Sequence, residues 1–217
     1  MNSDENRTTG VSLEILAYIR NKSLPCSYSE LYKNFVEKLG YNQNTVNYTI
    51  YQYKNLLRYS PGVLIHFDSL LWADEKQLAL ETLATNHLVD RESSGKPFGL
   101  VSHLYEYQHD QLPDLPDQIP WTPTLIGELL AYCDKFRIIG TQRDVFVSIP
   151  NKYNIESLDD LLYIILDSTY DGAANIDQFI SDMCESGILK KNLTSMMLGS
   201  ESRVVIDGKV VRLARLN

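Results

Sequence analysis

Apolar residues recur every three or four positions along three stretches near the start of the chain, a period that predicts α-helices. The first helix is expected over residues 12–21 and the third from Asn44 to about Tyr59. Between them, Ser27-Tyr28-Ser29-Glu30 matches a capping box that opens the second helix, and Gly40 is placed to end it. The apolar positions that set this period are Leu13, Leu16, Ala17 and Ile19 in the first helix and Leu31, Phe35 and Leu39 in the second.

The pattern then changes to short apolar runs separated by turn residues, which predicts a β-hairpin. Pro61-Gly62 forms a turn, residues 63–67 form a strand, and Leu70-Leu71-Trp72 are expected to be its partner. Three helices followed by a hairpin are the order of a winged helix, a variant of the helix-turn-helix fold. Residues 1–10 are expected to be a polar tail, so the first unit spans residues 11–72.

The same order recurs in residues 151–217. Ser157 and Asn175 are each expected to cap a helix, Gly187 to close the second of these helices, and a short third helix to follow over 190–198. Asp207-Gly208 lies between two β-branched runs, which is the strongest short-range signal of a hairpin, here expected over 204–211. This internal repeat predicts a C-terminal winged helix.

Residues 73–150 form a less regular middle unit. Helical periods cover 74–91 and 97–107, and a further helix is expected to start at Thr122-Pro123 with Thr122 as its N-cap. An acidic, proline-rich loop at 109–120 precedes that helix, and a hairpin over 137–149 follows it. The unit is either a winged helix with a long loop inserted or a helical linker domain followed by a hairpin. The predicted fold is therefore α+β and mostly helical, with two or three tandem winged-helix units, each of three helices plus a β-hairpin.

Residue types at matching spacings resemble those of one known family. Leu16-Ala17-Tyr18-Ile19, Tyr28-Ser29-Glu30-Leu31-Tyr32 and Gly40 are similar to the HARE-HTH winged-helix family, which includes the domain of the bacterial RNA polymerase delta subunit. Phe136-Arg137-Ile138-Ile139-Gly140 with Val145-Phe146-Val147 resembles the closing hairpin of that family. The resemblance covers roughly residues 1–65 and, more weakly, the other units. It implies association with nucleic acid or RNA polymerase, without catalysis.

Charge narrows the part of the chain that can contact nucleic acid. The 217 residues carry a net charge of −8, and their 44% hydrophobic and 22% charged content is typical of a globular protein. Residues 11–72 carry a net charge of +2, residues 73–150 carry −6 and residues 151–217 carry −3. Because an acidic chain repels DNA, only the first unit has the sign that suits a nucleic-acid contact.

The predicted third helix of the first unit is the candidate DNA-reading element. At about 100° per residue its polar side chains share one face, opposite Val46, Ile50, Tyr53 and Leu57, and that face carries no acid. Amides pair bidentately with adenine, arginine binds guanine or phosphate, and tyrosine stacks or binds phosphate. A protein-binding face and a plain solvated surface are the alternatives. The candidate residues are Asn44, Asn47, Tyr48, Tyr51, Gln52, Asn55 and Arg58, with Lys54 as a further phosphate contact.

A secondary basic patch is expected around the last hairpin. It comprises Lys190, Lys191, Arg203 and Lys209. Two structural roles explain these residues equally well: cations stabilise the negative end of a helix dipole, and charged side chains keep an edge strand from pairing with another chain.

The sequence gives no support for catalysis, a metal or a cofactor. The four histidines lack paired spacing, and Cys26, Cys133 and Cys184 are scattered, as reduced thiols are. No phosphate-binding loop, nucleophile elbow, secretory signal or membrane-spanning run is present. We therefore expect a cytoplasmic, non-catalytic regulator that binds double-stranded DNA sequence-specifically, in transcription or in a mobile-element or defence context. Its middle and C-terminal units are expected to contact a protein partner or a second copy. The alternative is a protein-interaction scaffold in which winged helices mediate assembly with a larger complex.

Overall fold

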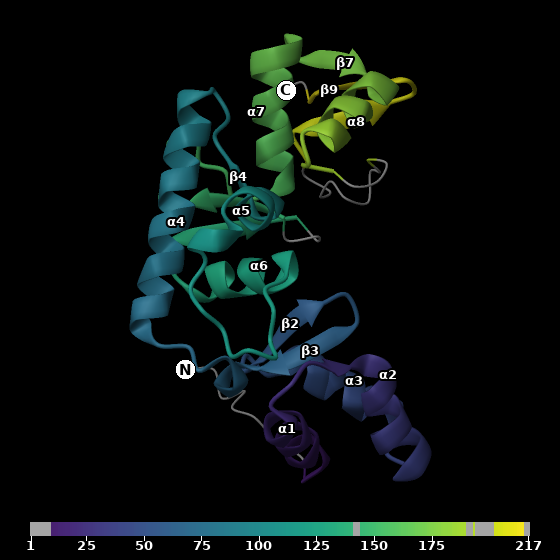
Figure 1. Cartoon of the computed structure of the whole chain (residues 1–217). Helices are drawn as coiled ribbons and strands as arrows, with labels where there is room; N and C mark the ends of the chain where they lie inside the picture. The colour runs from purple at the N-terminus through teal and green to yellow at the C-terminus, as the bar shows by residue number, and fades with distance from the viewer. Residues whose placement is uncertain (1–9, 141–143, 190–192, 194–201, 215–217) are drawn as a thin grey trace, which may run out of the picture. The chain divides into compact units, whose positions relative to one another are not determined.

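The computed structural model describes residues 10–140, 144–189, 193 and 202–214 (Figure 1). The protein is α+β, with small antiparallel sheets of three strands each in the described residues. Two compact units divide the chain, one of Met1–Leu80 with Asp110–Glu128 and one of Glu81–His109 with Leu129–Asn217. These bounds differ from the domain boundaries predicted after residues 72 and 150. Residues 110–128, which were expected in the middle unit, belong to the first compact unit.

The chain contains three structural repeats. The first, residues 10–66, builds one core between its helices and its sheet. Ile15 and Ile19 meet Leu31, Phe35 and Ile50 there, all at most 4% exposed. The elements are α1 (Gly10–Lys22), β1 (Cys26–Ser27), α2 (Tyr28–Leu31) continued by the π-helical segment η1 (Tyr32–Lys38), α3 (Gln43–Gln52), β2 (Leu56–Ser60) and β3 (Val63–His66).

The caps of α2 and η1 are partly as predicted. Ser27 Oγ accepts a hydrogen bond from the Glu30 amide at 3.1 Å, but the Glu30 carboxylate accepts from Tyr18 and Lys22 instead of reaching back. Gly40 has a φ of 71°, the left-handed conformation that glycine adopts at little cost after a helix. Leu39 was expected in the core and is 55% exposed, because the π-helical winding of η1 carries this position off the inward face.

Two predicted elements after α3 are wrong. The third helix ends at Gln52 instead of near Tyr59, and residues 56–60 form β2, in which Leu57 pairs with Ile65. The hairpin partner of β3 is therefore β2 and not Leu70-Leu71-Trp72. Phe67–Leu70 form the 3-10 helix η2, and Leu71 has a φ of 47° and lies 70% exposed. Pairing in the sheet satisfies the backbone of 56–60 and buries Leu56 and Leu57 together, which outweighs the helical period.

The second repeat has the same order of elements as the first, and the third matches it in the residues that the structure describes, which leave out most of the stretch before its hairpin. Each sheet places the second hairpin strand in the centre, with the orders β1-β3-β2, β4-β6-β5 and β7-β9-β8 (Figure 1). The second repeat contains α4 (Asp74–Ser93), β4 (Gly99–Leu100), α5 (Val101–Tyr107), the 3-10 helix η3 (His109–Gln111), α6 (Pro123–Tyr132), β5 (Phe136–Ile139) and β6 (Val145–Ser148). The third contains α7 (Leu158–Tyr170), β7 (Ala173–Asn175), α8 (Ile176–Glu185), β8 (Val204–Asp207) and β9 (Val210–Leu213).

Most of the local signals in these repeats are confirmed. Thr122 accepts a hydrogen bond from the Leu125 amide at 3.1 Å, Ser157 from Asp160 at 3.2 Å and Asn175 from Asp177 at 2.9 Å, as N-caps do. Both predicted hairpins are present. The helix expected over 97–107 is shorter, because Gly99–Leu100 pair with β6 as β4. The short helix expected over 190–198 lies almost wholly outside the described residues.

The acidic, proline-rich segment packs on the first repeat. Tyr59 Oη donates to the Pro120 carbonyl at 2.7 Å, and Trp121, which is 7% exposed, meets the ring of Trp72 edge-on at 5.8 Å. Trp121 Nε1 donates to the Pro113 carbonyl at 2.9 Å, which ties the segment to itself. Residues that were predicted to form a loop therefore complete the first compact unit.

The Trp72–Trp121 contact predicts a spectroscopic signature. These are the two tryptophans of the chain, and they meet edge-to-face within one unit. We expect exciton splitting in the far-ultraviolet circular dichroism that disappears in both Trp72→Phe and Trp121→Phe. Phe98→Tyr serves as a control in the other unit, since it leaves both indoles in place. A splitting that survives either tryptophan substitution would contradict the packing of this segment.

His87 is buried in the second unit without a partner for one ring nitrogen. Its ring is 8% exposed and stacks on Phe146 at 6.0 Å, with His103 at 6.1 Å. Within the described residues, Nε2 has no hydrogen-bond partner. Burial, followed by the charge of Arg91, lowers the pKa of His87 from 6.5 to about 4. The folded state therefore holds His87 neutral.

This burial predicts a loss of stability in mild acid. The folded pKa lies below the unfolded value, so the contribution of His87 is intact above pH 6.5 and is lost as the pH falls to about 4. The loss should reach about 3 kcal/mol of unfolding free energy. His87→Gln, which does not titrate, should flatten the pH dependence of urea unfolding in that window. Equal slopes for wild type and variant would contradict the assignment. His66 and His103, whose pKa values burial also lowers, leave a residual slope in both.

Candidate nucleic-acid interface

Helix α3 presents neutral polar and aromatic side chains outward. Its inward positions are Val46, Thr49 and Ile50, which are at most 4% exposed. Tyr48 is 57% exposed and Tyr51 is 74% exposed, and the helix contains no charged residue. Asn44 and Gln52 are exposed as well. The outer face therefore offers amide and phenol groups without a carboxylate that would repel a phosphate backbone.

Hydrogen bonds fix α3 on its neighbours. Asn42 Oδ1 accepts from the Asn44 amide at 2.8 Å and caps the helix. Thr49 shares a buried 2.9 Å hydrogen bond with Ser12 of α1. Tyr32 of η1 donates to Asn47 Oδ1, so this half-buried amide is partly engaged within the protein. Of the predicted contact residues on α3, Asn47 is the one whose side chain is engaged within the protein.

Arg58 lies on β2, outside the helix on which it was expected. Its Nε donates to Glu128 Oε1 of α6 at 3.0 Å. The side chain of Glu128 is 11% exposed and that of Arg58 is 43% exposed. This contact occupies the Nε edge of the guanidinium and places a carboxylate beside its charge. Lys54 and Asn55 are exposed in the turn between α3 and β2. Five of the predicted residues thus share α3, and three follow it.

Tyr28 connects the two parts of the candidate surface. It begins α2, and its half-buried ring has a raised pKa, mainly through burial and then through Tyr51. Arg58 opposes that rise, and Glu128 adds to it, so both charges act on the same phenol. The end of α3, the start of α2 and the Arg58–Glu128 pair consequently form one surface of the first unit, which we call the α3–β2 surface.

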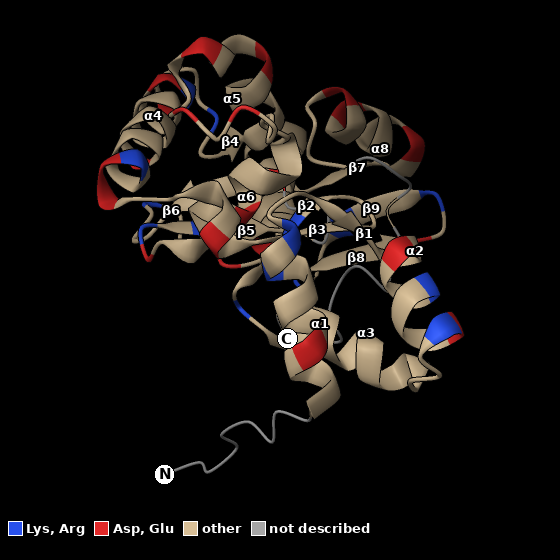
Figure 2. Cartoon of the chain, turned by 60° about the horizontal axis from the view of Figure 1, so that its bottom comes forward, with Lys and Arg blue, Asp and Glu red and all other residues tan. Residues whose placement is uncertain are grey.

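Basic residues flank the neutral helix. Figure 2 shows charged residues of both signs along α2 and its continuation η1 and none on α3; those of η1 are Lys33, Glu37 and Lys38. Lys33 and Lys38 are exposed, and Lys38 donates to Asn34 at 3.1 Å. Two other cations of this unit are paired, Lys22 with Glu30 and Arg20 with Asp68. Most positive charge available to a phosphate therefore lies on η1 and at Lys54.

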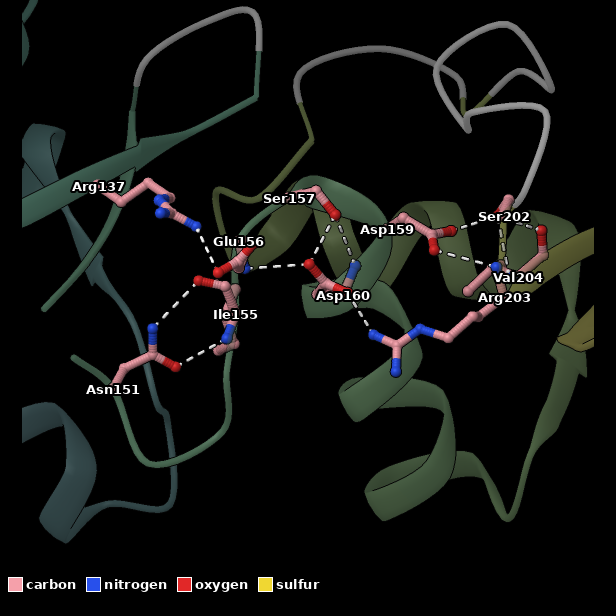
Figure 3. A network of polar contacts seen from close by, with 10 residues as sticks. All are labelled: Arg137, Asn151, Ile155, Glu156, Ser157, Asp159, Asp160, Ser202, Arg203 and Val204. Carbon is pink, nitrogen blue, oxygen red and sulfur yellow. Dashed lines mark hydrogen bonds and ion pairs between the residues drawn. The ribbon is translucent and has the colours of Figure 1, made fainter. Parts of the chain in front are cut away.

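Of the two described members of the predicted secondary patch, one is engaged in structural contacts. Arg203 pairs with Asp160 (Figure 3). Its guanidinium also lies over the ring of Tyr163 at 4.3 Å. Asp159 accepts from the Arg203 amide at 3.0 Å, which ties the start of α7 to the strand β8. Lys209 is exposed in the turn of the hairpin, and Lys190 and Lys191 lie outside the described residues. Of the described members, Arg203 stabilises the third repeat and Lys209 alone is exposed at a turn.

Sequence reasoning missed Glu128 and Tyr28 as parts of the surface. Glu128 lies 70 residues after its partner, and the predicted helical position of Arg58 pointed away from any such contact. Tyr28 was used only for the capping box and the family resemblance, and its place beside the turn between β2 and β3 depends on a contact between distant residues. The amide of Tyr28 donates to the Gly62 carbonyl at 2.8 Å.

Within the part of the chain that the structure describes, no group of three or more His, Cys, Asp or Glu side chains is placed to hold a metal ion. No helix in the same residues is long and apolar enough to span a bilayer. Burial raises the pKa of Cys26 to about 11, which keeps that thiol protonated and unreactive.

Comparison with known proteins adds no relative to this geometry. No family model matches the sequence, and no curated protein matches it significantly.

Proposed function

We propose that the chain is a non-catalytic DNA-binding protein whose first repeat reads double-stranded DNA with α3. The observation that carries the proposal is the exposed face of α3, with Tyr48, Tyr51 and Gln52 and no acid, beside the lysines of η1. Asparagine is a poorer helix former than lysine or glutamate, and glutamine is no better than they are. A requirement for solubility alone would therefore not favour these residues on the exposed face. Amides and phenols suit base edges and phosphate oxygens.

We further propose that the three repeats are tandem winged helices related to the HARE-HTH family. The support is their common order of elements and their common sheet order, with the second hairpin strand in the centre. In a winged helix the helix before the hairpin enters the major groove, and α3 holds that position in the first repeat. In the second repeat this position belongs to α6, which exposes Tyr132 and carries Glu128, the partner of Arg58.

Arg58 fits a phosphate contact at the edge of α3. Its Nε is held by Glu128, while its terminal amino groups make no hydrogen bond that involves a described residue, and the side chain is 43% exposed. Glu128 orients the guanidinium but also neutralises part of its charge. The expected result is a weak phosphate contact that grows when the carboxylate is removed.

The other repeats suit protein contacts better than DNA. Residues 73–150 carry a net charge of −6 and residues 151–217 carry −3, which disfavours a second phosphate surface. We assign them to a partner protein or a second copy, in a role in transcription or in a mobile-element or defence system. One observation favours a protein scaffold as the second candidate function: exposed Tyr48 and Tyr51 beside a neutralised arginine are also typical of protein interfaces.

Base reading by α3 predicts a position-specific loss. After selection of a preferred sequence from random DNA, Gln52→Ala should weaken binding by about 1–3 kcal/mol at one base position and relax specificity there. Asn21→Ala, an exposed amide at the end of α1, should leave the affinity unchanged. The measurement is a fluorescence-anisotropy titration over all single-base variants of the site. Failure to enrich any sequence, with the chain folded, would favour the scaffold function.

The Arg58–Glu128 pair predicts an opposite effect of removing an acid. Glu128→Gln should raise affinity for any DNA and steepen the slope of log affinity against log salt by about one. Arg58→Ala in that background should cancel both gains, because they act through the same guanidinium. Asp134→Asn makes the same change of net charge and should have a smaller effect. A sharp loss of sequence-specific binding in folded Glu128→Gln would show that the carboxylate itself takes part in recognition.

A further inference from the structure

The second compact unit contains a cavity that the DNA-binding proposal does not use. Its volume is about 250 Å³, and its walls come from the segment before β4, from α7 and from the end of α8. The residues that decide its chemistry are Lys96, Phe98, Tyr153, Ile164, Ser168 and Met183. The second and third repeats both contribute to the lining, so an occupant would contact both.

The walls are held by contacts that lie outside the cavity. Phe98 is 3% exposed, with the guanidinium of Arg91 over its ring at 5.0 Å and Arg91 Nε donating to its carbonyl at 3.2 Å. Ile164 and Ile165 of α7 pack against the core that contains Phe98 and Leu100. The cavity is therefore formed by packed elements of the fold rather than by a surface loop, as ligand sites usually are.

Three hydroxyl groups of the lining already have partners within the protein. Ser168 Oγ donates to the Ile164 carbonyl at 2.7 Å, and Ser186 Oγ donates to the Met183 carbonyl at 3.1 Å. The Tyr170 hydroxyl donates to Asp182. With these donors satisfied inside the protein, the lining offers mainly apolar and aromatic surface to an occupant. Met183 adds a side chain that adapts to the shape of a ring.

One charge completes the site. Lys96 is exposed, and among the described residues of the lining it is the single cationic side chain and no carboxylate accompanies it. The volume lies just below the range typical of drug-sized ligands, so the occupant is small. We propose that this cavity binds a small aromatic anion, with its rings between Phe98 and α7 and its carboxylate or sulfonate at Lys96. The proposal does not rest on DNA binding, and its test needs no nucleic acid.

Two naphthalene probes of one skeleton test the apolar and anionic parts separately. Anilinonaphthalene sulfonate carries the anion, and N-phenyl-1-naphthylamine lacks it. Each is titrated by fluorescence into the folded, full-length chain. We expect one site for both probes, with the sulfonate bound more tightly. Lys96→Met should weaken the sulfonate about three- to five-fold and leave the neutral probe unchanged, since it removes one solvent-exposed ion pair. Lys209→Met, at an exposed lysine outside the lining, should change neither affinity.

A bulky side chain placed at the opening of the cavity tests whether the probes bind there. Ser168 is exposed at the lining face of α7, so the indole of Ser168→Trp should cover the opening and weaken both probes about ten-fold or more. Ser181→Trp makes the same substitution at an exposed position of α8 outside the lining and should leave both affinities unchanged. Thermal unfolding confirms that each variant is folded. Unchanged binding in Ser168→Trp, or equal losses in both tryptophan variants, overturns the site. Unchanged sulfonate affinity in Lys96→Met overturns the anionic part.

Discussion

The central strand of each small sheet is the constraint on which the rest of the structure depends. β3, β6 and β9 each close a hairpin on one side and pair on the other side with a strand of two or three residues that follows the first helix. This pairing ties the start of a repeat to its end. In the first repeat it closes a core of Ile15, Leu31 and Ile50, against which α3 packs its inner face. On the outer face Tyr48, Tyr51 and Gln52 are exposed, so packing does not restrict which residues stand at these positions.

Each of the three hairpins carries an ion pair at a comparable position. Arg58 pairs with Glu128, Lys135 with Glu81 and Arg203 with Asp160, so a cation in or just before the first hairpin strand meets a helical acid every time. Such pairs hold the hairpin against a helix and remove cations from the surface. In an acidic chain this leaves little positive charge for a polyanion. The exposed lysines of η1 and Lys54 are therefore the main positive charges that the first repeat can offer to a polyanion.

Local signals predicted the local structure well and failed where distant pairing decides. Ser157, Asn175 and Thr122 cap helices, and Asp207-Gly208 turns a hairpin, because each acts within a few residues. Leu56 and Leu57 fit a helix as well as a strand, and only pairing with β3 settles the choice. The two-residue strands β1 and β4 exist only through such pairing. They are too short to give a pattern of alternating apolar and polar residues in the sequence.

The domain boundaries and part of the candidate site were hidden for a related reason. The compact units meet within α4 and α6, at Leu80 and Glu128, so no change of composition marks the division. The five predicted site residues up to Gln52 do share a helix. Arg58 does not, and its partner Glu128 lies too far along the chain for a pattern of spacing to reveal it. A cavity lined by two repeats is likewise a property of packing rather than of sequence period.

Helix α3 combines a weak intrinsic tendency to form with a well-defined surface. Its sequence from Gln43 to Gln52 has two asparagines, two threonines and a valine, and it lacks alanine, leucine, lysine and glutamate. Such residues cost up to about 0.7 kcal/mol each relative to alanine in a helix. Burial of Val46, Thr49 and Ile50 and the Asn42 cap therefore keep it helical. A sequence selected for stability alone would place good helix formers on the outer positions, where packing does not restrict the choice. The stability of the fold does not explain the amides and phenols found there, whereas the proposed contact with DNA does.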